Sequence, residues 1–176
     1  GVLPPGDIRN CLVALSTTEP LMEKLFQHRY KNRESLKDHS FGNLFIATMS
    51  EITGDFEEAI RASSKILAIQ GKVLPSTVDD VVLCAEFTDG TVVEGESVIS
   101  SYHGRIKRVF LRPSDAQALP EALEAIAEAD AIVLGPGSLY TSVIPNVLVK
   151  GMADAICRST AAKIYVCNIM TESGET

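Results

Sequence analysis

Hydrophobic residues in the first seventy positions recur every three or four residues, and polar residues separate the apolar stretches. In the first stretch, Ile8, Leu12 and Leu15 fall on one side of a helix, which is the pattern of a helix with one apolar face. The same periodicity predicts four helices in this part of the chain, which begin near residues 7, 20, 40 and 55.

Residues typical of helix ends set the expected limits of these helices. A hydroxyl group of Thr17 or Thr18 is expected to cap the second helix. Asp55 and Glu58 have the spacing of a capping box at the start of the fourth helix, and Gly71 is expected to end that helix.

Beyond residue 80 the hydrophobic pattern becomes typical of strands that alternate with helices. Two β-prone runs flank Asp89-Gly90, a strong signal for a β-hairpin. Further strands are expected over residues 105–113, 130–137 and 163–170, and helices over 120–129 and 147–160. Because the later strands are apolar on both faces, the pattern predicts an α/β fold: a mostly parallel sheet with helices on both faces, plus the β-hairpin as an insertion.

Composition narrows the class of protein. The chain has 176 residues, 45% of them hydrophobic, and a mean hydropathy of +0.14, which suits a soluble globular domain or part of one. No apolar run reaches the roughly 18 residues that cross a bilayer, and no signal-peptide pattern opens the chain. The sequence therefore predicts a cytoplasmic protein without membrane insertion. A start at Gly1 rather than Met predicts a fragment of a larger domain.

Charge and cysteine content exclude further classes. The net charge of -7 disfavours binding to nucleic acid, which needs basic residues. The cysteines form no CxxC pair and no His lies at zinc-ligand spacing, so no metal site is predicted. The sequence predicts buried free thiols at the four cysteines, Cys11, Cys84, Cys157 and Cys167.

The richest candidate for chemistry is the stretch "LGPGSLYTS", which follows an apolar strand. Its glycines would let backbone N–H groups approach a ligand, and its hydroxyls add donors, so it suits a phosphate or nucleotide. The alternative is a tight turn in which Ser138 only caps the next helix. The candidate residues are Gly135, Pro136, Gly137, Ser138, Thr141 and Ser142.

A second candidate lies at the start of the first helix. Asp7, Arg9 and Asn10 place a carboxylate, a fork-shaped cation and an amide within four residues, as in a clamp for a substrate or a phosphate. The alternative is that Asp7 caps the helix and Arg9 pairs with a surface carboxylate.

A third candidate precedes the third helix. His39, Ser40 and Asn43 could line a pocket, with His39 as a donor or a proton carrier. Alternatively, Ser40 is only the N-cap and His39 is an exposed loop residue. The sequence contains neither HExxH nor GxSxG, so no catalytic residue is identified.

Five motifs carry a resemblance that covers essentially the whole chain. They are "GVLPPGDIRNCLVALS", "HSFGNL", "EITGDFEEAI", "LGPGSLYTSVIPN" and "YVCNIMTESGET". Together they resemble the bacterial gluconeogenesis-factor (YvcK-like, UPF0052) branch of the CofD-like family, whose other branch contains 2-phospho-L-lactate transferase.

The resemblance implies a Rossmann-like α/β protein that binds a nucleotide. It implies phosphate contacts for the "LGPGSLYTS" residues. It supports a pocket lined by Asp7, Arg9, Asn10, His39, Ser40, Asn43 and Asn168. Residues 1–176 would form the central part of a single CofD-like domain. The family's glycine-rich first turn, its aspartate pair and its C-terminal region are expected to lie outside this chain.

Two functions follow from the resemblance. The first is a cytoplasmic regulatory protein that binds a UDP-sugar or related nucleotide diphosphate and supports growth on gluconeogenic carbon sources, cell-wall formation and cell shape. The alternative is transfer of a phospholactyl-type group from a nucleotide diphosphate-linked donor to a deazaflavin, with Mg²⁺. Only the second function implies a cofactor. Oligomeric state is left open, with a homo-oligomer among the alternatives.

Overall fold

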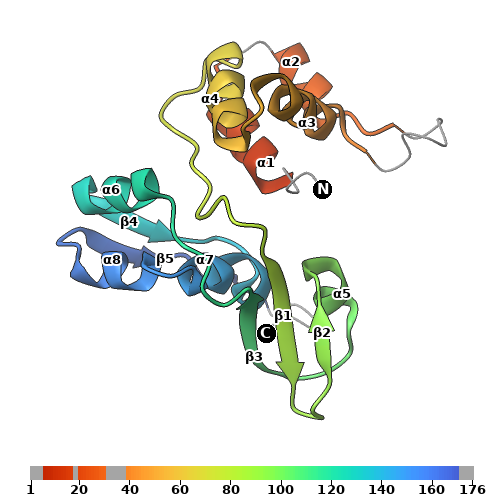
Figure 1. The fold of residues 1–176 in the computed structure, drawn as a ribbon, viewed down its shortest axis with the longest axis vertical. Helices are drawn as coiled ribbons and strands as arrows, with labels where there is room; N and C mark the ends of the chain where they lie inside the picture. Colours follow the sequence, from red (N-terminus) through yellow and green to blue (C-terminus); the bar gives the residue numbers. More distant parts are fainter. Residues whose placement is uncertain (1–5, 18–19, 31–38, 171–176) are drawn as a thin grey trace. The chain divides into compact units, whose positions relative to one another are not determined.

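The computed structural model describes residues 6–17, 20–30 and 39–170 of the chain (Figure 1). It divides into two compact units, Gly1–Pro75 and Ser76–Thr176. The assignment of the whole chain to one domain stays a prediction.

The first unit is helical, and the four predicted helices are confirmed. Their bounds are α1 (Gly6–Leu15), α2 (Pro20–Gln27), α3 (Phe41–Thr53) and α4 (Phe56–Ile66). Apolar residues spaced along these helices meet in one core, whose fully buried members are Leu12, Phe26, Ile46 and Leu67. Phe26 lies edge-on to Phe41, with ring centroids 5.6 Å apart, so aromatic packing joins α2 to α3.

The predicted caps are confirmed in part. The Asp55 side chain accepts a hydrogen bond from the backbone N–H of Glu58 at 2.8 Å and so starts α4. Gly71 does not end this helix, because α4 stops at Ile66 and Leu67 turns into the core. The Thr17 hydroxyl donates to the backbone carbonyl of Ala68 at 2.9 Å, and Thr18 lies outside the described residues.

The second unit begins with an antiparallel sheet in the strand order β2-β1-β3. Its strands are β1 (Val82–Phe87), β2 (Val92–Glu94) and β3 (Ile106–Arg112). The predicted hairpin is confirmed, with Gly90 at a φ of 89° in the turn between β1 and β2. A short helix that the pattern did not predict, α5 (Glu96–Ser101), packs on this sheet and buries Ile99.

The rest of the second unit contains a parallel pair, β4 (Ala131–Leu134) and β5 (Ala162–Tyr165). The α-helices described beside the pair are α6 (Pro120–Glu128), α7 (Ile144–Leu148) and α8 (Met152–Arg158) (Figure 1). The helix expected over residues 147–160 is divided, because Gly151 takes a φ of 97° ahead of α8.

The predicted α/β class is confirmed, with both parallel and antiparallel pairing. Among the described strands, parallel pairing is confined to β4 and β5, because β3 returns beside β1 in the antiparallel sense. The C-terminal end of β4 leads directly into the "GPG" stretch, and this position matters for the site.

The prediction of four buried cysteines is wrong at three positions. Cys84 on β1 is fully buried, whereas Cys11, Cys157 and Cys167 are exposed. Burial raises the pKa of the Cys84 thiol above its usual value. Cys11 and Cys157 lie on exposed positions of α1 and α8, and Cys167 lies beyond the end of β5, none of which their apolar sequence neighbours reveal. Within the described ranges, no helix is long and apolar enough to cross a membrane.

Candidate functional site

The first candidate is the segment that follows β4, residues 135–138, which we call the Gly135 loop. Gly135 has a φ of 85°, a conformation that favours glycine. A Cβ atom on Gly135 would lie 2.6 Å from the carbonyl oxygen of Val166. Position 135 therefore requires glycine so that the Val166 carbonyl, just beyond β5, can lie close to its backbone. This requirement is independent of any ligand.

The Gly135 loop leads into a short π-helix, η2 (Leu139–Val143). The carbonyl of Ser138 accepts hydrogen bonds from the N–H groups of Ser142 and Val143, at 2.9 and 3.0 Å. The side chain of Ser138 does not cap η2, and Thr141 is buried. Irregular π-turns of this kind occur often at functional sites.

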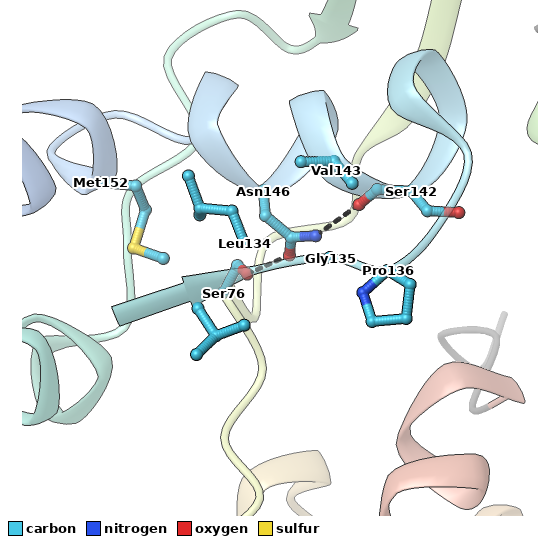
Figure 2. A pocket seen from close by; sticks show the side chains of 9 residues that line it. Ser76, Leu134, Gly135, Pro136, Ser142, Val143, Asn146 and Met152 are labelled. Carbon is cyan, nitrogen blue, oxygen red and sulfur yellow. Dashed lines mark hydrogen bonds between the residues drawn. The ribbon is translucent and has the colours of Figure 1, made fainter. Parts of the chain in front are cut away.

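Three of the predicted residues, Gly135, Pro136 and Ser142, line an open pocket of about 330 Å³ (Figure 2). Much of its wall is formed by apolar side chains of β4, η2 and α8. They are Val133 and Leu134 from β4, Val143 from η2 and Met152 from α8. Gly137, Ser138 and Thr141 are not among the residues that line it. The structure thus divides the predicted loop into pocket residues and supporting residues.

Two polar residues of this pocket, Ser76 and Asn146, were missed by sequence reasoning. The Ser76 hydroxyl donates a hydrogen bond to Oδ1 of Asn146, and Nδ2 of Asn146 donates to the carbonyl of Ser142 at 2.7 Å (Figure 2). Asn146 ends the "LGPGSLYTSVIPN" motif, so its place in the motif was a usable signal. Ser76 lies seventy positions earlier and gave no signal of its own.

The second and third candidates meet in the first unit. Arg9 is buried and donates from Nη1 to the Ser40 hydroxyl at 2.7 Å and to Oδ1 of Asn43 at 3.2 Å. Its Nη2 donates to Oδ1 of Asn10 at 2.7 Å. We call these residues, Arg9, Asn10, Ser40 and Asn43, the Arg9 cluster. The alternative considered for Arg9, a surface ion pair with a carboxylate, does not occur among the described residues.

The hydrogen-bond partners of the buried Arg9 guanidinium are neutral side chains. Burial, reinforced by the charge of Arg29, lowers the pKa of Arg9, while Asp7 acts in the opposite direction. Nε of Arg9 is buried without a hydrogen-bond partner in the described part of the chain. A Cβ atom on Gly42 would lie 2.7 Å from Cδ of Arg9, so α3 accommodates the arginine only because this position is glycine.

The remaining predicted residues lie around these two groups. Asp7 is exposed in the first turn of α1, inside the helix rather than at its N-cap. Ser40 is the N-cap of α3 and accepts from the N–H of Asn43 at 3.2 Å, while His39 is exposed. Asn168 is half-buried after β5. A role for any of them in ligand binding stays a prediction.

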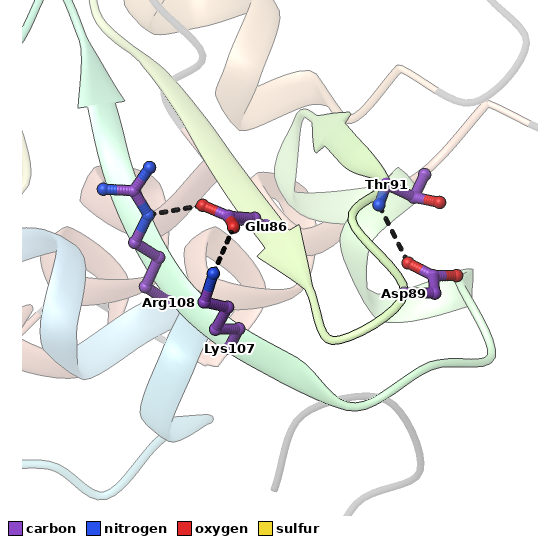
Figure 3. A network of polar contacts seen from close by, with 5 residues as sticks. All are labelled: Glu86, Asp89, Thr91, Lys107 and Arg108. Carbon is purple, nitrogen blue, oxygen red and sulfur yellow. Dashed lines mark hydrogen bonds and ion pairs between the residues drawn. The ribbon is translucent and has the colours of Figure 1, made fainter.

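Charged side chains of the second unit pair on the antiparallel sheet. Glu86 accepts from Nζ of Lys107 at 2.7 Å and from Nε of Arg108 at 2.6 Å (Figure 3). The hydrogen bonds from Lys107 and Arg108 lower the pKa of Glu86. The hydrogen bond from the backbone N–H of Thr91 likewise lowers the pKa of Asp89. Within the described ranges, no group of three or more His, Cys, Asp or Glu side chains could hold a metal ion.

The fold and the pocket define a class: a mixed α/β protein with an open pocket at the C-terminal end of a parallel strand, a common position for ligands in such sheets. The family model described as "2-phospho-L-lactate transferase CofD" matches residues 1–176. The chain therefore belongs to the CofD family.

Curated relatives and solved structures refine this placement. The chain is 57% identical over 173 residues to the gluconeogenesis factor of Halalkalibacterium halodurans, and the aligned region covers 98% of this chain and 54% of the relative. It is 54% identical to the gluconeogenesis factor of Bacillus subtilis, and this aligned region covers 98% of this chain and 55% of the relative. The chain thus spans about half the length of these relatives.

A crystal structure of a UPF0052-family protein from Bacillus halodurans matches with a TM-score of 0.95 at 56% identity. The match covers 99% of this chain and 56% of the crystallised chain. The resemblance inferred from the five motifs is confirmed by these comparisons.

Proposed function

We propose that the full-length protein that carries this chain is a cytoplasmic gluconeogenesis factor that binds a UDP-sugar. One observation carries the proposal for this chain: Gly135, Pro136 and Ser142, predicted from sequence as nucleotide contacts, border an accessible pocket. The name shared by the Halalkalibacterium and Bacillus relatives supports the physiological part. In this proposal the protein couples UDP-sugar supply to growth on gluconeogenic carbon sources, cell-wall formation and cell shape.

The composition of the pocket favours binding over catalysis. The described residues that line it include no ionisable side chain, so this part of the site offers no group for general acid–base chemistry. A regulatory protein needs only differential affinity for its ligand, which neutral hydrogen-bonding groups and apolar walls supply.

A second candidate rests on the family description, which names 2-phospho-L-lactate transferase. In this alternative, the full-length protein transfers a phospholactyl-type group from a nucleotide diphosphate-linked donor to a deazaflavin, with Mg²⁺. The described residues do not fit the metal, because they bring together no group of three or more carboxylates, histidines or cysteines that could hold it.

Isothermal titration of the full-length protein with UDP-N-acetylglucosamine, with and without Mg²⁺, tests the first candidate. Saturable binding that does not depend on the metal, without turnover of the ligand, is the expected result. Product formed from a deazaflavin and a nucleotide-linked phospholactate would establish the transferase instead. Absence of binding by any nucleotide diphosphate sugar would overturn the first candidate.

A further inference from the structure

We propose that the pocket beside the Gly135 loop receives the uncharged base of the nucleotide, and that Asn146 reads the hydrogen-bonding edge of this base. The inference rests on the proposed function and deepens it. It assigns Asn146 as a specificity-determining residue and Ser76 as the residue that positions it.

The walls of the pocket suit a base better than a diphosphate, so the inference departs from the phosphate contacts that the resemblance implies for Gly135, Pro136 and Ser142. The side chains of Leu134, Val143 and Met152 are apolar, and the polar groups are neutral hydroxyl and carboxamide groups. A diphosphate partly enclosed by such walls would lose hydration without meeting a positive charge, whereas a flat, neutral heterocycle loses little. The volume of about 330 Å³ lies at the lower end of ligand pockets, roughly 300 to 1,000 Å³, and suits one ring system with part of its ribose.

Hydrogen bonds fix the carboxamide of Asn146 in one orientation. The Ser142 carbonyl can only accept, so the atom of Asn146 that faces it must be the donor Nδ2. On the other side, the Ser76 hydroxyl donates to Oδ1. Rotation of the amide by half a turn would place oxygen against oxygen at Ser142, which makes the reversed orientation unfavourable.

A carboxamide held in this way still carries one N–H donor and one acceptor lone pair. Asn146 is exposed and lines the pocket, and in the proposed pose both groups face the ligand. A base edge with an adjacent acceptor and donor can pair with them, in the manner in which asparagine pairs with bases in nucleic-acid complexes. Because the reversed orientation of the amide is unfavourable, one order of donor and acceptor on the base fits better than the other.

Uracil and cytosine provide the sharpest test of this order. The two rings have the same shape, but uracil presents a carbonyl acceptor beside an N–H donor where cytosine presents an amino donor beside a nitrogen acceptor. An oriented amide must favour one of the two rings. Under the proposed function, the favoured ring is uracil.

The first experiment measures dissociation constants of UDP and CDP for the full-length protein and for the Asn146→Asp variant. We expect the wild type to prefer UDP by about tenfold or more, the effect of one mismatched hydrogen bond. The carboxylate has only acceptors, which suit the amino group of cytosine, so the UDP to CDP preference should fall by about tenfold. An unchanged ratio would overturn the inference, even where both affinities fall together.

The second experiment uses Ser76→Ala, with Ser101→Ala as a matched control. The Ser101 hydroxyl also donates to a protein acceptor, the Val98 carbonyl at 2.9 Å, but Ser101 does not line the pocket. Ser76→Ala frees one side of the amide, so the preference should fall by about threefold while Ser101→Ala leaves it unchanged. If Ser76→Ala and Ser101→Ala showed the same UDP to CDP preference, Ser76 would not be the residue that positions Asn146.

These outcomes separate the inference from the proposed function. If UDP and UDP-sugars bind but Asn146→Asp leaves the base preference unchanged, the proposed function stands and the inference fails. If the wild type binds neither UDP nor a UDP-sugar, both fail.

Discussion

Polar side chains in the Arg9 cluster bind one another, whereas those around the Gly135 loop border a pocket. Arg9 gives three hydrogen bonds to Ser40, Asn43 and Asn10 and is buried. In the second unit, Asn146 is held by two neighbours but remains an exposed residue that lines the pocket. Similar residue types therefore hold helices together in one region and leave groups available to a ligand in the other.

Both regions also depend on a glycine at a close approach. Gly42 makes room for the Arg9 side chain, and Gly135 makes room for the Val166 carbonyl. A Cβ atom at either position would meet a backbone carbonyl, but Gly135 also has a φ of 85°, whereas Gly42 lies outside the left-handed region, so only Gly135 adds backbone strain to the close contact. Substitutions at these two positions test the comparison most directly.

Gly135→Ala should have the largest effect, a loss of about 4 kcal/mol in the free energy of unfolding. About 1 to 2 kcal/mol comes from the positive φ, and the rest from the contact with Val166. Gly90→Ala is the matched control, because Gly90 has a φ of 89° with no atom within 4 Å of a Cβ. The control should lose only about 1 to 2 kcal/mol in urea unfolding of the full-length protein. Equal losses would show that the approach of Val166 contributes nothing.

Gly42→Ala should lose about 3 kcal/mol, the upper part of the usual range for overpacking. Its Cβ would meet Cγ and Cδ of Arg9 and the Phe26 carbonyl, all within 2.8 Å. Gly6→Ala in α1 is the control, since nothing lies within 4 Å of a Cβ there, and it should cost nothing. Urea unfolding checks both variants. A Gly42→Ala protein as stable as the control would mean that the Arg9 cluster is loosely packed.

Ser40→Ala should lose about 2 kcal/mol, because Ser40 is both the N-cap of α3 and an acceptor for Arg9. Asp55→Ala provides the comparison, since Asp55 caps α4 without a buried partner, and it should lose about 1 kcal/mol. Thermal and urea unfolding measure the difference. Equal losses would show that the hydrogen bond between Arg9 and Ser40 has no net effect on stability.

The smallest effect is expected at Glu86, where exposed cations pair with the carboxylate. Hydrogen bonds from Lys107 and Arg108 lower the pKa of Glu86 in the folded state. Its contribution to stability is therefore present above the ordinary pKa of a glutamate and is lost as the pH falls through the lowered folded value. Thermal unfolding should show that the wild type is slightly more stable than Glu86→Gln at neutral pH. This difference in stability should disappear as the pH falls through the lowered pKa of Glu86. Salt should reduce this advantage. An advantage of the wild type that is constant with pH would contradict the assignment.

Much of the fold was accessible from the sequence because local chemistry decides it. The spacing of Ile8 and Leu12 predicted α1, and Asp55 with Glu58 predicted the start of α4. Asp89-Gly90 predicted the hairpin. Each of these signals acts over a few residues, so no knowledge of the rest of the molecule was needed.

The sequence predicted individual motifs of the candidate sites but not the contacts between them. The motifs around Arg9 and Ser40 are thirty-one positions apart, and the sequence does not show that the guanidinium and the hydroxyl meet. Ser76 escaped notice because a lone serine in a loop has no distinctive pattern. Cys11 was expected in the core because its neighbours are apolar, but its position on α1 leaves it exposed.

The sequence by itself determined where most helices and strands form, the hairpin turn and the polar motif after β4, since these depend on periodicity, caps and turn residues. Tertiary structure alone decided that Arg9 lies among neutral partners, that Gly135 faces the Val166 carbonyl, and that Ser76 and Ser142 hold Asn146 at a pocket. The physical reason is distance along the chain. Contacts between residues tens of positions apart form only when the whole core packs.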